Sequence, residues 1–178
     1  MRWIQDHPFV VTTVVLAAVV AHAVAAAFWS PLDIWHPLVE MEPDGVGVLY
    51  LGLAGLSAAI AGFAGVIVIF GLEGHSRKFL TFRVAAGNSL RANWMSVVLS
   101  SFASAAIALV ATVLAFLGRG TIGPWLFELS AFLIFHSAAR LTWLLSALMR
   151  VVASEDEAQA RENNKRSLDS LFAQRKVS

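Results

Sequence analysis

The chain has 178 residues, of which 58% are hydrophobic and 14% are charged, and its formal net charge is +1. A soluble domain of this length carries about a quarter charged residues, so the composition excludes an ordinary soluble domain and indicates an integral membrane protein. No cysteine is present, which excludes disulfides, thiolate metal sites and cysteine nucleophiles.

Four apolar blocks follow one another along the chain, each long enough to cross a bilayer core of about 30 Å as a helix. Strand-type alternation is absent from all four, and a helix satisfies its own backbone hydrogen bonds in lipid. The predicted spans are residues 8–29, 46–72, 94–117 and 125–148. The sequence therefore predicts an all-α integral membrane protein: a four-helix transmembrane bundle over residues 1–152, then a charged cytoplasmic tail, partly helical, over residues 153–178.

The first block, residues 8–29, has two interpretations. An apolar run that ends in the triplet Ala-His-Ala at 21–23 resembles a secretory signal peptide with its cleavage site. However, the run continues past this triplet to Trp29, and Asp6 offsets the positive charge that a signal peptide carries before its apolar run. We favour a retained spanning helix and keep cleavage as the alternative, since the remaining topology is the same in both cases.

The connection after this block mixes apolar and acidic side chains. Trp35 suits the headgroup layer, so we expect the segment to lie along the outer interface. Glu40, Glu42 and Asp44 alternate, and hard cations such as calcium bind several carboxylate oxygens, but no EF-hand spacing is present. An acidic loop that holds no cation is the favoured interpretation.

The second span is rich in small residues at four-residue spacing. Between helices in lipid, the attraction comes from close backbone approach and van der Waals packing. We therefore expect a packing seam through which the protein joins a homo-oligomer or a larger membrane complex. The small-residue seam consists of Gly55, Ala59, Gly62 and Gly65.

The connection before the third span interleaves basic with apolar residues. This pattern predicts a short amphipathic helix on an anionic inner leaflet, which Gly87 ends, with Asn88 or Ser89 capping the third span. The same surface is a candidate docking site for a cytoplasmic protein. Nucleic-acid binding is not expected, because the cluster is small and close to the membrane. The basic residues are Arg77, Lys78, Arg83 and Arg91.

The third span carries a stripe of small and hydroxyl side chains at strict i+4 spacing. The favoured interpretation is helix packing, with hydroxyls that donate to carbonyls one turn back. The alternative is a hydroxyl-lined water path. The stripe consists of Ser96, Ser100, Ser104, Ala108 and Thr112.

The fourth span places three ionisable residues on one helical face: Glu128, His136 and Arg140. Charged groups are costly in hydrocarbon, so their depth decides their interpretation. At a rise of about 1.5 Å per residue, Glu128 lies near the outer surface and Arg140 near the inner surface. We expect both of these side chains to reach water, which leaves His136 as the mid-membrane group.

Three interpretations of His136 remain open. The favoured one is a neutral histidine buried against Ser100, Ser104 or a backbone carbonyl. The second is an ion or proton path through the three ionisable residues of this span, extended by His22, Ser100 and Ser104. The weakest is a haem held by His22 and His136, because their depths differ by about 6 Å.

Lysine and arginine concentrate at the N-terminus, in the second connection and in the tail, whereas the first connection is acidic. The positive-inside rule therefore predicts that both termini are cytoplasmic. The Ala/Val/Gly-rich spans and brief loops suit a bacterial plasma membrane.

No motif of a soluble enzyme or metal site is present, so we predict no catalytic, cofactor-binding or metal-binding residue. The expected function is that of a small non-enzymatic protein of the lipid bilayer, acting as a subunit, sensor or anchor for a cytoplasmic or membrane partner. The alternative is a channel or transporter that uses polar groups of the third and fourth spans.

Overall fold

The computed structural model describes residues 8–73 and 77–175, and no strand occurs in these two ranges. Its helical elements are α2 (Pro8–Phe28), the 3-10 helix η1 (Ser30–Leu32), α3 (His36–Glu40), α4 (Pro43–Glu73), α5 (Arg77–Phe116) and α6 (Gly123–Arg175). Four of them, α2, α4, α5 and α6, are long and apolar enough to cross a membrane. This confirms the predicted all-α class with four candidate spans.

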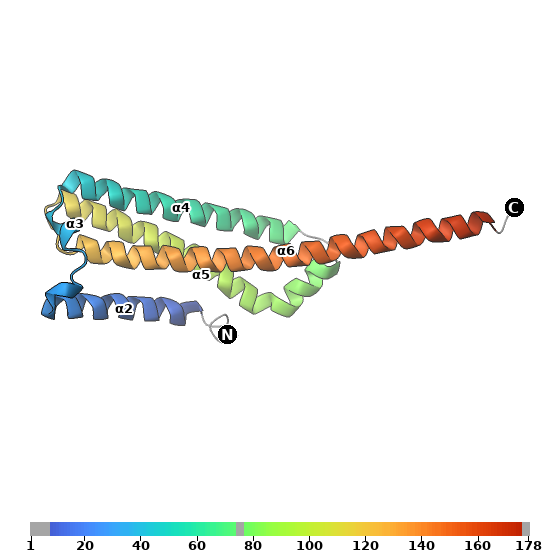
Figure 1. Ribbon diagram of the computed structural model, residues 1–178, viewed down its shortest axis with the longest axis horizontal. Helices are drawn as coiled ribbons and strands as arrows, with labels where there is room; N and C mark the ends of the chain where they lie inside the picture. Colours follow the sequence, from blue (N-terminus) through green and yellow to red (C-terminus); the bar gives the residue numbers. More distant parts are fainter. Residues whose placement is uncertain (1–7, 74–76, 176–178) are drawn as a thin grey trace.

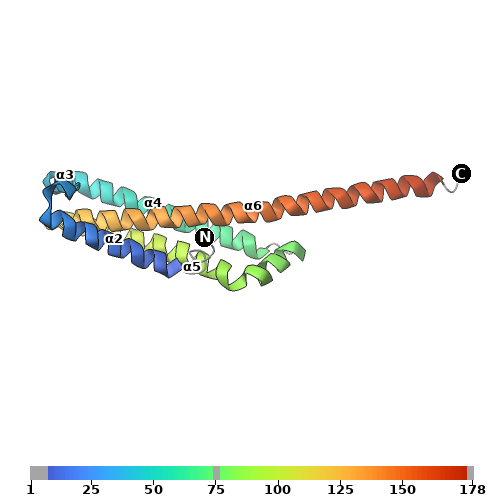
Figure 2. The same ribbon diagram turned by 60° about the horizontal axis from the view of Figure 1, so that its bottom comes forward.

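The four long helices lie side by side in an elongated bundle (Figures 1 and 2). Extensive contacts join α4 to α5 and α5 to α6, whereas α2 lies along α6 and α5 with fewer contacts. Residues 29–42 and 117–122 gather at one end of the bundle, the loop end (Figure 1). The opposite end, beyond which α6 continues alone, is the tail end.

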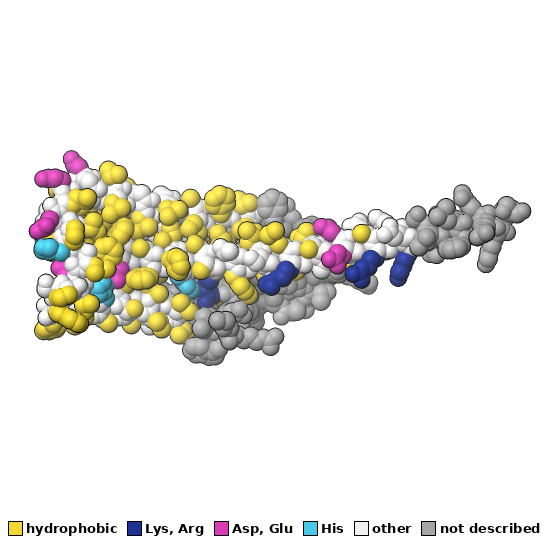
Figure 3. Space-filling model, viewed as in Figure 1, with side chains coloured by type: hydrophobic (Ala, Val, Ile, Leu, Met, Phe, Trp, Pro, Cys, Tyr) yellow, Lys and Arg dark blue, Asp and Glu magenta, His cyan; other side chains and the backbone are white. Residues whose placement is uncertain are grey.

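Small residues fill the interior of the bundle, and large apolar residues cover its outside. Ala108 and Ala111 are fully buried on α5, and α4 buries a face of Ala54, Ala61 and Ala64. Large side chains such as those of Phe63, Phe102 and Phe135 are exposed. Small residues allow helix backbones to approach closely, and an apolar exterior is suited to lipid. The apolar exterior fills the face between the two ends (Figure 3).

Two apolar clusters hold α4, α5 and α6 together at different heights. The cluster near the loop end contains Val46, Tyr50, Ala111 and Ala115, with Leu126 and Phe127 packed against it. The cluster nearer the tail end contains Ala64, Val97 and Leu144, with Trp94, Val98 and Leu141 packed against it. By contrast, the buried apolar residues of the described part of α2 are Val19 and Ala26. The first helix is therefore the most loosely held of the four.

Charged side chains concentrate towards the two ends of the molecule (Figure 3). The exposed acidic residues Glu40, Glu42 and Asp44 lie in or beside the loop-end connection, and the exposed Arg150, Arg161 and Lys165 lie on α6 towards its C-terminus. Asp156, Glu157 and Glu162 are exposed on the same part of α6, so the apolar length of the bundle separates an acidic end from an end with charges of both signs.

The helix α5 runs from Arg77 to Phe116 without interruption. The prediction of a separate amphipathic helix ended by Gly87, with a new cap at Asn88 or Ser89, is therefore wrong. A single glycine inside a helix costs only about 1 kcal/mol, which is too little to end it. The first part of α5 instead turns at an angle to the remainder (Figures 1 and 2).

The helix α6 also continues past its predicted end, as one helix of 53 residues up to Arg175. Ser154, six residues past the predicted end of the span, donates a hydrogen bond to the carbonyl of Val151 at 2.8 Å, inside the helix. Residues 149–175 form a helical arm that extends about 40 Å past the predicted span at 1.5 Å per residue. The tail is thus a direct continuation of the fourth span.

Candidate functional site

Polar side chains inside the bundle form three layers between the loop end and the tail end. The loop-end cluster consists of His22, Trp35, Glu128 and the carbonyl of Leu32. The hydroxyl cluster consists of Ser57, Ser101, Ser104, Ser130 and Ser137. The third layer is the pair of Arg140 and Asn93.

The loop-end cluster is organised around the Glu128 carboxylate, which is 6% exposed. His22 Nδ1 lies 2.9 Å and 3.0 Å from its two oxygens, and Trp35 Nε1 donates to Oε2 at 2.8 Å. The other imidazole nitrogen, Nε2, lies 3.0 Å from the carbonyl of Leu32. Three segments, α2, the η1 connection and α6, therefore meet at one carboxylate.

The local fold of residues 29–35 brings this cluster together. The short helix η1 has proline in its first turn, where the missing N–H costs nothing, and it turns the chain back over α2. The His22 ring lies edge-on to Trp125 at 5.3 Å, and the Trp35 ring lies edge-on to Phe127 at 5.5 Å. These aromatic contacts surround the polar contacts with apolar surface.

The position of Glu128 differs from the expectation that it reaches outer headgroup water. A buried carboxylate is stable only when its oxygens accept hydrogen bonds, preferably from a charged donor. His22 and Trp35 supply these donors inside the bundle. Trp35 correspondingly turns inward, although the sequence indicated only that it lies along the interface.

The hydroxyl cluster joins α4, α5 and α6 through fully buried serines. Ser104 Oγ lies 2.8 Å from Ser57 Oγ and 2.8 Å from Ser130 Oγ. Ser101 Oγ lies 2.6 Å from Ser137 Oγ. Tertiary contacts of this kind require small side chains on all three helices.

Every hydroxyl proton of this cluster has an acceptor within the protein. Ser57 donates to the carbonyl of Leu53, Ser104 and Ser130 donate to each other's carbonyls, and Ser137 donates to the carbonyl of Val97, all at 2.8–2.9 Å. Ser101 then donates to Ser137 Oγ. The cluster forms a closed set of hydrogen bonds and needs no water.

The predicted stripe of the third span lies in this interior. Its members Ser96, Ser100, Ser104, Ala108 and Thr112 are all 5% exposed or less. Thr112 donates to the carbonyl of Ala108 at 2.9 Å, one turn back, as the packing interpretation expects. Ser104 instead bonds to the neighbouring helices α4 and α6.

Arg140 also differs from its expectation of reaching water, since it is 9% exposed. Its guanidinium donates to Oδ1 of Asn93, which is 1% exposed on α5. A buried guanidinium needs acceptors for its donors, and the amide of Asn93 supplies one.

His136 is the residue whose favoured interpretation, a neutral imidazole buried against a hydroxyl or a carbonyl, stays a prediction. Its Nε2 is buried without a hydrogen-bond partner, as are Trp94 Nε1 and the Tyr50 hydroxyl among the described side chains. Ser104 is occupied by its bonds to Ser57 and Ser130. The predicted path residues are therefore divided: His22 joins Glu128, Arg140 joins Asn93, Ser104 joins the hydroxyl cluster, and Nε2 of His136 stands apart.

The haem interpretation also fails on geometry, because both nitrogens of His22 face oxygen acceptors rather than a common site with His136. Within residues 8–73 and 77–175, no three His, Asp or Glu side chains are grouped closely enough to hold a metal ion.

The small-residue seam of α4 points away from the other three helices. Gly55, Ala59 and Gly62 are exposed, and a Cβ added at Gly55, Gly62 or Gly65 would meet nothing within 4 Å. The face that packs against α5 and α6 lies elsewhere on the helix. Association of the chain through this seam stays a prediction.

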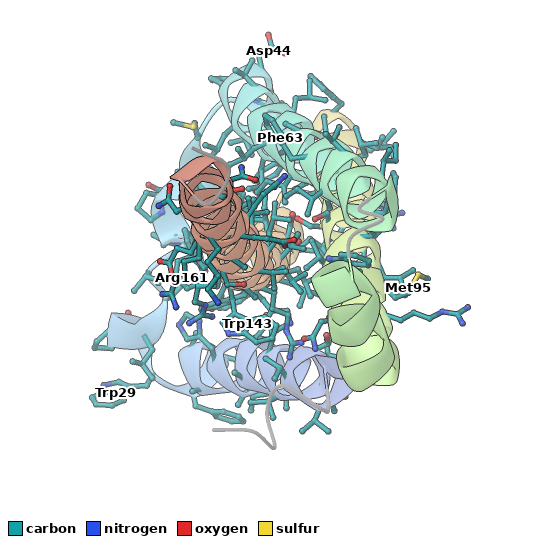
Figure 4. All side chains as sticks on the ribbon, turned by 90° about the vertical axis from the view of Figure 1, so that its right-hand side faces the viewer. Trp29, Asp44, Phe63, Met95, Trp143 and Arg161 are labelled. Atoms are coloured by element: carbon teal, nitrogen blue, oxygen red, sulfur yellow. The ribbon has the colours of Figure 1, made fainter. Side chains whose placement is uncertain are left out.

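The basic surface lies largely outside the described side chains. Arg77, Lys78 and Arg83 belong to α5, but their side chains lie outside the described residues; Arg91 is described and exposed. In a view along the bundle from its tail end, Met95 of the same helix points outward, as does Trp29 of the loop end (Figure 4).

No known protein family matches this sequence, and comparisons with curated proteins and with solved structures find no similar chain. The function is therefore argued from three features of the molecule itself: the closed polar layers, the apolar exterior and the helical arm.

Proposed function

We propose that the protein is a small non-enzymatic multi-pass membrane protein that anchors a cytoplasmic partner through the helical arm of α6. The observation that carries this proposal is the continuity of α6, which runs as one helix from the bundle into the arm. A continuous helix transmits the position and rotation of its buried part to its free part. In this proposal the bundle anchors the protein in the membrane, and the arm binds the partner.

The surface of the arm supports this role. Its described side chains carry both signs of charge and are exposed, with Arg161 3.6 Å from Glu157 one turn earlier. A helix that is polar all round is typical of a spacer between a domain and its partner. The apolar residues Leu168, Leu171 and Phe172 lie further along, where side chains are outside the described part, and they are our candidate contact for the partner.

We also propose that both termini lie in the cytoplasm and that the membrane is a bacterial plasma membrane. The acidic loop end and the basic residues of the arm follow the positive-inside rule in this orientation. Arg119, in the loop-end connection, is the exception.

A photo-cross-linking amino acid at Arg161 tests the role of the arm. We expect one discrete protein adduct in cells, because a docked partner lies against the arm. The matched control is Leu109, which is 49% exposed on the apolar surface of α5 and should yield lipid adducts only. Absence of an adduct at both Arg161 and Lys165, in a protein that accumulates normally, would contradict the proposal.

The alternative function is an ion or proton channel. It is favoured by one observation, the buried and unpartnered Nε2 of His136 in the middle of the fourth span. It is opposed by the hydroxyl cluster, whose protons are all used within the protein. A conducting path through one chain would have to break these bonds.

Flux of ions and protons into proteoliposomes distinguishes the two functions. We expect no flux above that of protein-free liposomes under an applied potential, because the hydroxyl cluster closes the interior. Flux that falls or rises in Glu128→Gln or His136→Leu, but not in the control Phe135→Leu, would favour the channel. Phe135 suits this control because it is 74% exposed on the same helix.

A further inference from the structure

The imidazole of His22 faces an oxygen acceptor on each side. A backbone carbonyl has no proton to donate, so the Nε2 that lies 3.0 Å from the carbonyl of Leu32 must carry a proton. On the other side, Nδ1 lies 2.9 Å from Glu128 Oε1. A bare nitrogen lone pair against a carboxylate oxygen would repel it, so one further proton must lie between these two atoms.

Two proton arrangements satisfy this geometry equally. In one, an imidazolium donates to a carboxylate; in the other, a carboxylic acid donates to a neutral imidazole that keeps its Nε2 proton. Both have no net charge and hold the same number of protons. Trp35 donates to Oε2 in either case. The pair therefore holds one proton more than a neutral histidine beside a carboxylate.

We propose that His22 and Glu128 form a proton-binding site that fastens α2 to α6, and that release of this proton loosens α2 at the loop end. This inference rests on the loop-end cluster alone and does not depend on the partner proposed for the arm. The ligand is a proton, and no other group is consumed or released.

The consequence of proton release follows from the remaining bonds. A neutral imidazole carries one N–H, so His22 can keep its contact with Glu128 or its contact with Leu32, but not both. Glu128 keeps Trp35 as a donor, and the η1 connection therefore stays near α6. The described part of α2 has few other anchors, since its buried apolar residues are Val19 and Ala26. The first helix is the element that moves.

Other charged groups around His22 do not replace this proton. The carboxylate of Asp33, the residue that follows η1, lies 3.7 Å from His36 Nδ1. In residues 91–116 of α5 the one charged side chain is Arg91, 25 residues before the loop-end terminus of the helix at Phe116. The remaining described charged groups at the loop end are Glu40, Glu42, Asp44 and Arg119, and those further along the span on α6 are His136 and Arg140.

The sign of the pH dependence follows from the proton count. Both contacts of His22 are made while the pair holds its proton, and one of them is lost as rising pH removes that proton. The state in which α2 is docked is therefore less stable at alkaline pH than at mildly acidic pH.

Spin-label distances measure this movement directly. The chain has no cysteine, so Phe28→Cys and Ile122→Cys introduce one label each on α2 and just before α6. Both positions suit labels, being 88% and 51% exposed. In lipid nanodiscs we expect one short distance at pH 6 and an added population of longer distances at pH 9.

Variants of His22, Glu128 and His36 identify the group that causes the pH response. His22→Gln and Glu128→Gln should each give the same distances at both pH values. His36→Gln should keep the wild-type response, because the side chain of His36 is 64% exposed and its ion pairs lie at 3.3 Å and 3.7 Å.

Three outcomes would overturn the proposal: identical distances at pH 6 and pH 9 in the unaltered pair, a response that persists in either His22→Gln or Glu128→Gln, or a response lost in His36→Gln. Should one of the cluster variants fail to fold, the other variant and the His36→Gln control still decide.

Discussion

Replacing Glu128 by leucine is expected to lower the free energy of unfolding by about 3–5 kcal/mol, the usual cost of removing one partner of a buried ion pair. The substitution leaves Nδ1 of His22 without its hydrogen-bond partner and the indole N–H of Trp35 without an acceptor in an apolar interior. The side chain of Glu128 is 8% exposed, and that of its partner His22 is 23% exposed.

Reversible unfolding in detergent micelles at pH 6 measures this effect. Glu40→Leu is the matched control, because the Glu40 side chain is 70% exposed at the same end of the molecule, and it should change stability by less than about 0.5 kcal/mol. The double variant His22→Leu/Glu128→Leu should lose less than the sum of the two single variants. Equal losses for Glu128→Leu and Glu40→Leu would mean that the cluster contributes nothing to stability.

Replacing Ser104 by leucine is expected to cost about 1–3 kcal/mol or more through overpacking. Ser104 is fully buried where α4, α5 and α6 meet, with the hydroxyls of Ser57 and Ser130 each at 2.8 Å. A leucine has no space there unless the three helices separate, and it also removes an acceptor and a donor from the cluster.

Ala103→Leu provides the control for this substitution, since Ala103 is the preceding residue on α5 and is exposed. The same unfolding assay should show a change of less than about 0.5 kcal/mol for it. Similar effects of the two leucines would show that the serines are not tightly packed and would reopen the water-path interpretation.

The four candidate spans were predictable from the sequence because a bilayer requires about 20 apolar residues in a row, and few other folds do. The ends of the helices were not predictable in this way. Hydropathy marks where a segment stops being apolar, whereas a helix ends where its hydrogen bonding is interrupted. For this reason α6 passes residue 148 and α5 passes Gly87.

The layers of the candidate site were predictable only in part. Helical periodicity placed Glu128, His136 and Arg140 on one face, but it gives no information about which helix lies against that face. The partners Asn93 and Trp35 come from segments that depth arguments treated separately. Ser130 and Ser137 lie seven residues apart on one face of α6, and both are hydrogen-bonded to α5. This spacing could have indicated the face of the fourth span that packs against the third, but the prediction for that span used only its charged residues.

The separation of His22 and Glu128 along the chain has a consequence for biosynthesis. The two residues are 106 positions apart, so at about 5–20 residues per second α2 is complete roughly 5–20 s before Glu128 is translated. During this interval α4 and α5 can pair with each other, while α2 still lacks its polar partner. The helix α2 thus leaves the ribosome before α4, α5 and α6, yet it docks only after α6 has been made.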